Sequence, residues 1–168
     1  MEHFGKYTLE TVYLGTIEAQ RQEIMHLWQT QGVLPDAAER LRRSHEAVVL
    51  VRNQNGALAG LSTVGLLAAA NGRLFYSYRM FIRSADRVPY LMIAVTRCTC
   101  NFLRTFCHPS GHVDALVVIS ENPKLMRPGM RRVMRRIGFT CSGYTSTGLD
   151  CWRMDLPAKD SCPAPLLP

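Results

Sequence analysis

The sequence of 168 residues predicts an α/β (α+β) fold in which helices flank a mixed, mostly antiparallel central sheet. Three observations support this prediction. Strand and helix patterns follow one another in the order β-α-α-β-β-β-α-β-α-β-β between residues 7 and 156. Two Asn-Gly pairs, Asn55-Gly56 and Asn71-Gly72, are typical of tight turns between antiparallel strands. An amphipathic helix over residues 88–106 follows these turns, and its apolar side must cover one face of the sheet.

The composition is that of a globular protein. Hydrophobic residues make up 47% of the chain and charged residues 20%, which excludes disorder for the body of the chain. We expect a single domain over residues 1–156 and a flexible, proline-rich tail over residues 157–168. No apolar stretch reaches the roughly 20 residues that a membrane span requires, and residues 1–6 lack the apolar region of a signal peptide. We therefore expect a cytoplasmic protein, or a nuclear one if the source has a nucleus.

The first half of the chain predicts one strand, two helices and a three-stranded meander. A first strand is expected over residues 9–14. Apolar residues then recur at helical spacing from Ile17 onward, with Thr16 as the expected N-cap and Gly32 as the end of this helix. Pro35 opens a second, short helix. The strands expected around the two Asn-Gly turns cover residues 47–51, 57–67 and 74–82.

The second half predicts the long helix, a buried strand, a kinked helix and a final hairpin. The strand covers residues 113–119, which are apolar except for Asp114. Asn122 is the expected cap of a helical segment that Pro128 must kink, because proline cannot donate a hydrogen bond to the preceding turn. Gly138 ends this segment. The two strands of the final hairpin are expected over residues 139–145 and 149–156.

Basic residues outnumber acidic residues by twenty to thirteen, which gives a net charge of +7. This charge favours an acidic partner, such as a phosphorylated cofactor, a nucleic acid or an acidic carrier protein, although solubility alone explains it equally well. One stretch contains six basic residues and no acidic one, namely Lys124, Arg127, Arg131, Arg132, Arg135 and Arg136. Two interpretations stay open for it: a solvated helix face, and a docking surface for nucleic acid or an acidic carrier protein.

The six cysteines are interpreted as reduced thiols, since they lack the density of a secreted disulfide scaffold. Cys98 and Cys100 are two residues apart on the long helix and therefore do not share a face. No other pair has the spacing of a zinc site. We therefore expect no metal.

The order of elements resembles that of the GNAT superfamily (general N-acetyltransferases) over residues 7–156. Two local features carry the resemblance. An aromatic strand over residues 74–82 leads through an arginine-bearing turn into the long helix, and a strand ending at Ser120 is followed by Asn122, a helix and Gly138-Phe139. The second feature is similar to the family's Asn…Gly-Phe run. The resemblance implies an enzyme that transfers an acyl group from acetyl-CoA or a longer acyl-CoA to an amine acceptor.

The resemblance also implies where coenzyme A binds, namely with its pyrophosphate on amide groups at the start of the long helix, where the helix dipole favours an anion. The implied cofactor-binding residues are Ile82, Arg83, Arg87, Val88, Tyr90 and Asn122. The sequence departs from the family's Arg/Gln-x-x-Gly-x-Gly/Ala loop, because Tyr90 and Met92 stand at the glycine positions when Arg87 is placed first. Pro89 also removes one backbone donor. The alternatives are binding of the phosphates in another register, nearer Ser84-Ala85, and loss of the cofactor.

Acyl transfer to an amine requires a base, or an amine that its surroundings keep neutral, together with a donor for the oxyanion and often an acid for the leaving thiolate. Glu121, just past the buried strand, is the first candidate for the base, and its alternative role is that of an exposed carboxylate at a helix start. The family's tyrosine acid is replaced here by Met134, so Tyr144 and Tyr78 are the candidates for the acid, each otherwise a packing residue. Arg79 either binds an anionic group of the acceptor or faces solvent.

Two further functions stay open beside acyl transfer. One is a GNAT-fold protein that binds or modifies nucleic acid through the basic residues at positions 124–136. The other is a catalytically silent GNAT-fold module for protein interactions, which the replaced glycines and the missing tyrosine favour. The acceptor, the acyl chain length and the formation of a homodimer are all left open by the sequence.

Overall fold

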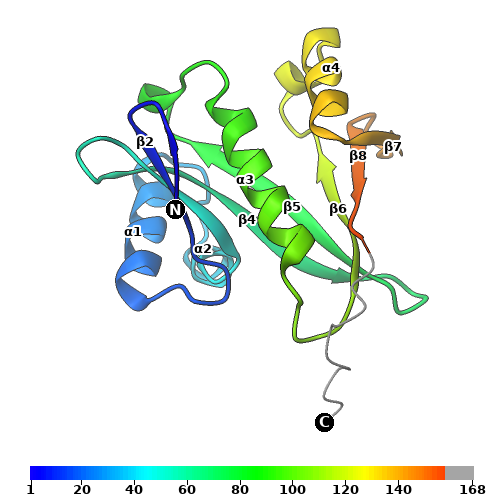
Figure 1. Cartoon of the computed structure of the whole chain (residues 1–168), viewed down its shortest axis with the longest axis horizontal. Helices are drawn as coiled ribbons and strands as arrows, with labels where there is room; N and C mark the ends of the chain where they lie inside the picture. The colour runs from blue at the N-terminus through cyan, green and yellow to red at the C-terminus, as the bar shows by residue number, and fades with distance from the viewer. Residues whose placement is uncertain (158–168) are drawn as a thin grey trace. The chain divides into compact units, whose positions relative to one another are not determined.

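The computed structural model describes residues 1–157 and contains strands and helices in the expected order, preceded by one additional strand (Figure 1). The strands are β1 (Glu2–Phe4), β2 (Tyr7–Thr11), β3 (Ala47–Arg52), β4 (Leu58–Ala68), β5 (Leu74–Ile82), β6 (Val113–Ile119), β7 (Thr140–Tyr144) and β8 (Asp150–Asp155). The helices are α1 (Glu18–Thr30), α2 (Ala37–Ser44), α3 (Leu91–Thr105) and α4 (Pro128–Ile137), with short 3₁₀ turns η1 (Ser84–Asp86) and η2 (Pro123–Met126). The predicted tail lies outside the described residues, apart from residue 157.

The strands form one eight-stranded sheet in the order β1-β2-β3-β4-β5-β6-β8-β7. The pair β5–β6 is parallel, whereas β1–β2, β2–β3, β3–β4, β6–β8 and β7–β8 are antiparallel. The predicted fold class is therefore confirmed. By their contacts the residues group into two compact units, which are described separately below: residues 1–65 with 79–102, and residues 66–78 with the chain from 103 onward. The single domain stays a prediction.

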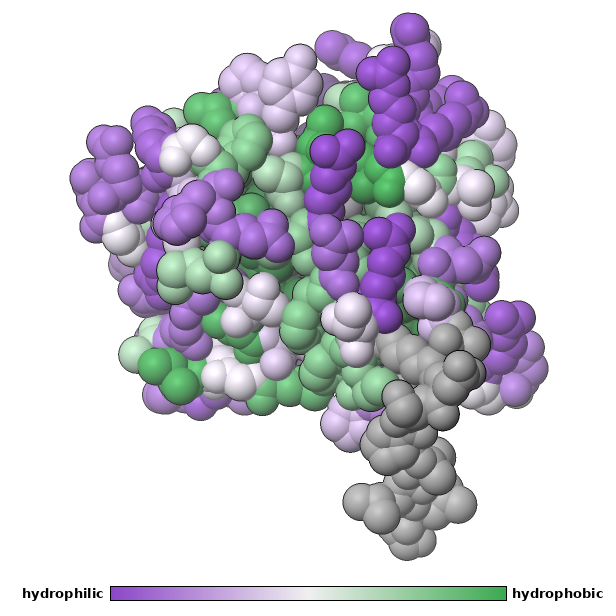
Figure 2. Space-filling view, viewed as in Figure 1, coloured by the Kyte–Doolittle hydropathy of each residue, from purple (hydrophilic) through white to green (hydrophobic). Residues whose placement is uncertain are grey.

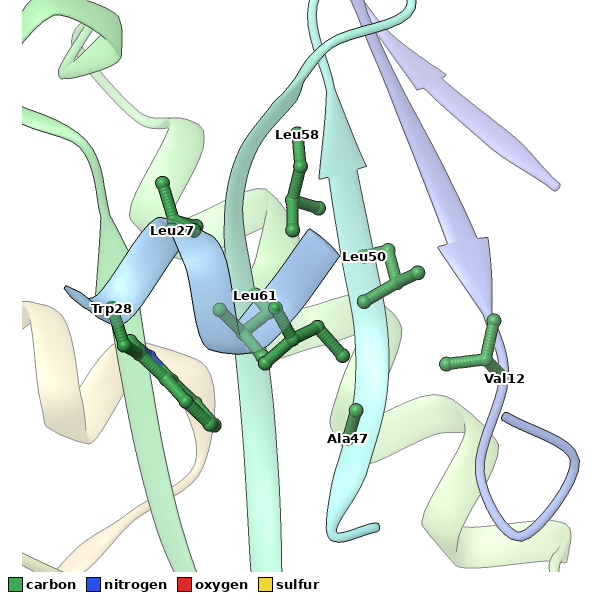
Figure 3. Close-up of a cluster of buried hydrophobic side chains, with 8 residues drawn as sticks. Val12, Leu27, Trp28, Ala47, Leu50, Leu58 and Leu61 are labelled. Carbon is green, nitrogen blue, oxygen red and sulfur yellow. The ribbon is translucent and has the colours of Figure 1, made fainter. Parts of the chain in front are cut away.

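The core of the first unit lies between α1 and strands β3 and β4 (Figure 3). Leu27 and Trp28 of α1 pack with Leu50 and Leu61 in a cluster that is almost fully buried. All residues of β3 from Ala47 to Val51 are buried, which explains the uninterrupted apolar run in the sequence. This rigid core supports β4, and through it the end of β5.

The N-terminal hairpin was not predicted, and it changes the first strand. β1 pairs with β2 around Gly5, whose φ of 55° is in the left-handed region that glycine adopts without strain. The strand expected over residues 9–14 instead ends at Thr11, and Leu14 has a φ of 56° that no strand permits. The predicted N-cap, Thr16, is also wrong: Ile17 holds that position, and the Gln20 side chain accepts its backbone N–H at 3.1 Å.

Proline explains two further differences from the predicted elements. The long helix begins at Leu91 rather than at residue 88, because Pro89 favours an extended residue before it. Pro128 does not kink a continuous helix but opens α4 as its first residue, and Arg127 before it is extended, with a ψ of 147°. Asn122 caps η2 as expected, since its side-chain oxygen accepts the Lys124 N–H at 3.0 Å.

In the second unit, α4 is joined to β8 by an ion pair. The Arg131 guanidinium donates two hydrogen bonds to the Asp150 carboxylate, from Nε to Oδ2 at 2.7 Å and from Nη2 to Oδ1 at 2.8 Å. These bonds raise the pKa of Arg131, and Asp150 is fully buried. Arg131 therefore does not belong to an exposed ridge with Arg127 and Arg135, which is how its i, i+4 spacing would be interpreted.

Within residues 1–157, Cys98, Cys100, Cys107, Cys141 and Cys151 are free thiols. No group of three or more His, Cys, Asp and Glu side chains in this part of the chain is placed to hold a metal ion. No helix described by the structure is long and apolar enough to cross a membrane.

Candidate functional site

The first unit brings most of the predicted cofactor-binding residues into one segment, between the end of β5 and the start of α3. The end of β5 is fixed on β4, because the Arg83 N–H donates to the Ala59 carbonyl at 2.8 Å. The two strands approach closely at Gly60: a Cβ added there would lie 2.5 Å from the Phe81 carbonyl oxygen. Glycine is therefore required at this position, because any side chain would push β5 away from β4. The close approach of the two strands fixes the position of Ile82 and of the loop that follows it.

The loop after β5 is held by a buried carboxylate, Asp86, which is only 6% exposed. It accepts hydrogen bonds from Arg83 Nε at 2.6 Å and from the Tyr7 hydroxyl at 3.3 Å. Burial, followed by the negative charge of Asp86, raises the pKa of the Tyr7 hydroxyl, so Tyr7 stays protonated as a donor. Arg83, predicted to bind phosphate, is thus engaged within the loop, and Asp86 and Tyr7 are positioning residues that the sequence analysis missed.

Arg87 is the predicted cofactor-binding arginine that remains available. Its Nε donates to the Ile82 carbonyl at 3.0 Å, which fixes the guanidinium against the end of β5. The side chain is otherwise exposed, and no carboxylate in residues 1–157 pairs with it. Its terminal nitrogens are therefore free to donate to an anion, and guanidinium binds phosphate in a bidentate manner.

The start of α3 carries backbone donors without acceptors. The Leu91 N–H donates to the Val88 carbonyl in a long bond of 3.4 Å, and the Ala94 N–H donates to the Tyr90 carbonyl at 3.0 Å. Within residues 1–157, the N–H groups of Met92 and Ile93 have no acceptor. These donors and the positive end of the helix dipole together favour an anion at this position.

Tyr90, at a position where the family's loop has glycine, has a backbone conformation that is typical of glycine. Its φ is 66°, in the left-handed region, so the chain turns into α3 as it would at a glycine. The ring is 73% exposed, so most of it is in contact with solvent. The left-handed backbone at this position costs about 1 kcal/mol in strain, because tyrosine has a Cβ that glycine lacks.

The strain predicts opposite effects of two substitutions. Tyr90→Gly is expected to raise the free energy of unfolding by up to about 1 kcal/mol, because relief of the strain exceeds the entropy that glycine adds to the unfolded chain. Tyr90→Val is expected to lower it by about 1 kcal/mol or more, since a β-branched residue tolerates this φ least. Urea unfolding followed by circular dichroism measures both, and equal stability of the two variants would show that residue 90 is unstrained.

The second unit places the candidate catalytic residues Glu121 and Tyr144 at the same end of three strands. The Ser120 N–H, just before Glu121, donates to the Asp150 carbonyl at 2.9 Å, and Tyr144 is the partner of Asp150 on the other side. One strand thus separates Glu121 and Tyr144, a backbone distance of about 10 Å. Both side chains are exposed.

The remaining candidates are at least partly buried or already take part in a structural hydrogen bond. Tyr78 is buried and follows the last β5–β6 pair, Ser77 with Val117. Arg79 is half-buried in the first unit. Asn122 caps η2 with its side-chain oxygen, so only its amide nitrogen is left for a ligand. The catalytic and substrate roles of these residues stay predictions.

No known family profile matches the chain, and neither does any curated protein sequence. Solved structures do match it. A GNAT superfamily phosphinothricin acetyltransferase from Sinorhizobium meliloti, in complex with AcCoA, aligns with a TM-score of 0.65 at 14% identity, over 90% of this chain and 89% of that one. A GNAT family acetyltransferase from Bacillus cereus aligns with a TM-score of 0.61 at 13% identity, over 92% of this chain and 100% of the other.

A spermidine N-acetyltransferase from Vibrio cholerae, in complex with CoA and spermine, aligns with a TM-score of 0.61 at 12% identity, over 91% of this chain and 97% of that chain. Identities this low establish a shared fold and nothing finer. The alignments nevertheless cover about nine tenths or more of each protein. The chain therefore has the fold of the GNAT acetyltransferase superfamily.

Proposed function

We propose that the protein is an acyltransferase that moves an acyl group from acyl-CoA to an amine. The observation that carries this proposal is the start of α3, where the N–H groups of Met92 and Ile93 have no acceptor within residues 1–157. They follow Arg87, whose terminal nitrogens are available, by five and six positions in the sequence. Two structures of the same fold support it, since the phosphinothricin acetyltransferase holds AcCoA and the spermidine N-acetyltransferase holds CoA. The pyrophosphate of coenzyme A is the anion that these donors would bind.

The reaction assigns a role to each of the candidate catalytic and substrate-binding residues. The amine nitrogen attacks the thioester carbonyl, a C–N bond forms and the C–S bond breaks. The nitrogen loses a proton, for which the exposed carboxylate of Glu121 is the proposed acceptor. The leaving thiolate gains a proton, and Tyr144 is the preferred donor over Tyr78, because its exposed hydroxyl can exchange protons with solvent. Arg79 is the proposed contact for an anionic group of the acceptor.

A thiol-release assay tests the reaction. The full chain is incubated with acetyl-CoA, or with a longer acyl-CoA, and with a polyamine, a free amino acid or a peptide with a free N-terminus. We expect thiol release that depends on one of these amines, and Glu121→Gln to lower it in the presence of saturating acyl-CoA. Failure of the protein to bind either acyl-CoA would contradict the proposal.

Arg87 gives a sharper test of the cofactor site. Arg87→Gln is expected to weaken acetyl-CoA binding about tenfold or more, because a charge-assisted hydrogen bond to phosphate contributes about 1.5–3 kcal/mol. Arg97→Gln is the matched control, since Arg97 is an exposed arginine farther along α3. Isothermal calorimetry measures both variants. An equal loss in the two would indicate only a general effect of net charge.

A further inference from the structure

The exposed side of η2 and α4 is a purely basic surface. It consists of five exposed residues, which we call the basic face: Lys124, Arg127, Arg132, Arg135 and Arg136. No acidic residue occurs in the sequence between Glu121 and Asp150, and no carboxylate in the described chain forms an ion pair with any of the five. Hydrophilic side chains project at the upper right of Figure 2, where α4 lies in Figure 1. Within residues 1–157 the positive charge of this face is therefore uncompensated.

Arg131, the arginine that attaches α4 to β8, is not part of the basic face. Arg131 is directed at Asp150, which neutralises it, and its side chain is only 35% exposed. The apolar residues of α4 face inward as well: Ile137 is buried, and Met130, Val133 and Met134 are half-buried. The remaining arginines are thus not needed to attach α4 to β8, and their mutual repulsion has no structural compensation.

The chemistry of the basic face distinguishes between acidic partners. A protein partner requires an apolar or aromatic anchor at the centre of the interface, and no exposed position of α4 provides one. A phosphodiester backbone requires only cations, and four of the five residues are arginines, which bind phosphate in a bidentate manner. Arg132 and Arg136 are one helical turn apart, about 6 Å along the axis, which allows contact with successive phosphates.

We propose that the basic face docks on the phosphate backbone of double-helical nucleic acid, without reading its sequence. The face supplies charge and hydrogen-bond donors but no aromatic ring for stacking on unpaired bases, which favours a duplex over a single strand. The basic face belongs to the second unit, whereas the proposed acyl-CoA site at the start of α3 belongs to the first. Failure of the proposed docking in an experiment would therefore leave the proposed acyl transfer unaffected.

The test is a fluorescence anisotropy titration of the full chain against a labelled DNA duplex of about 20 base pairs and mixed sequence, at about 50 and 200 mM salt. The variant Arg132→Gln/Arg136→Gln is compared with Lys6→Gln/Arg97→Gln, which removes the same number of charges from exposed positions elsewhere. We expect the first variant to lose about tenfold or more in affinity and about 1.8 in the slope of log affinity against log salt. The control is expected to lose much less.

Three outcomes would overturn the proposal: no binding of the duplex at low salt, an equal loss in both variants, and competition by a polyglutamate peptide as effective as that of unlabelled duplex. The last result would assign the face to an acidic protein instead. Circular dichroism of each variant verifies that α4 is still folded, and acetyl-CoA binding by the same samples shows whether the first unit is intact.

Discussion

Gly60→Ala is expected to lower the free energy of unfolding by about 3 kcal/mol. The added Cβ would lie 2.5 Å from the Phe81 carbonyl oxygen and 2.9 Å from the Ile82 Cα. Both are backbone atoms, so no side-chain rotation relieves the contact, and β4 and β5 must move apart. The same movement displaces Ile82, whose carbonyl accepts the Arg87 Nε–H, so acetyl-CoA affinity should fall as well.

The matched control is Gly65→Ala, the same substitution on the same strand. Its added Cβ would meet only the Glu46 carboxylate, at 3.2 Å, and a side-chain end can move away. We expect a change below about 1 kcal/mol in urea unfolding. Comparable losses in the two variants would contradict the assigned role of Gly60, because the loss would then follow from glycine replacement in β4 rather than from the contact with β5.

Asp150→Asn is expected to lower the free energy of unfolding by about 2–3 kcal/mol. The substitution keeps the size of the side chain but removes the charge from a fully buried position and replaces one acceptor by a donor that faces Arg131. The guanidinium then has one acceptor instead of two, and α4 loses its polar attachment to β8. Urea unfolding measures the loss.

Asp155→Asn, on the same strand, is its control. Asp155 also accepts a hydrogen bond from an arginine, Arg153, at 2.6 Å, but its side chain is largely exposed. Surface pairs of this kind contribute little, so we expect a change of about 0.5 kcal/mol or less. If Asp150→Asn were equally mild, the ion pair would not be what holds α4.

Local signals in the sequence were sufficient for the strands that position the site. β5 and β6 have the predicted bounds, because the aromatic and apolar runs are ended by glycine turns on one side and by polar residues on the other. Both Asn-Gly turns are present, and Gly56 and Gly72 have positive φ values of 76° and 78°. Gly138 ends α4 in the left-handed conformation, as predicted.

The sequence was insufficient where distant residues determine the structure. Asp86 and Tyr7 are 79 residues apart, and Asp150 and Arg131 are 19 residues apart, so no local pattern indicates that either carboxylate is buried. An Arg-x-x-Asp spacing is visible in the sequence at positions 83–86. Only the hydrogen bond from Tyr7 to Asp86 shows that this pair holds the loop after β5 in place. For the same reason Arg83 was assigned to the implied cofactor site, and Arg131 was counted among the residues of either a solvated helix face or a docking surface.

In the loop between β5 and α3, a local signal in the sequence was visible but misleading. The replacement of glycine by tyrosine at position 90 favours loss of function when only the residue type is considered. The backbone nevertheless adopts the left-handed conformation at Tyr90, directly before the first residue of α3. The residue type at position 90 therefore did not predict the backbone conformation found there.

The most direct test of the proposed cofactor site is the response of two amides to coenzyme A. In a ¹H–¹⁵N NMR titration of the full chain, the account predicts large shifts of the Met92 and Ile93 amide signals on addition of coenzyme A, because these N–H groups acquire a phosphate acceptor. Pantetheine, which lacks the pyrophosphate, should leave both signals nearly unchanged. Unaltered Met92 and Ile93 signals at saturating coenzyme A, or equal shifts with pantetheine, would contradict the account.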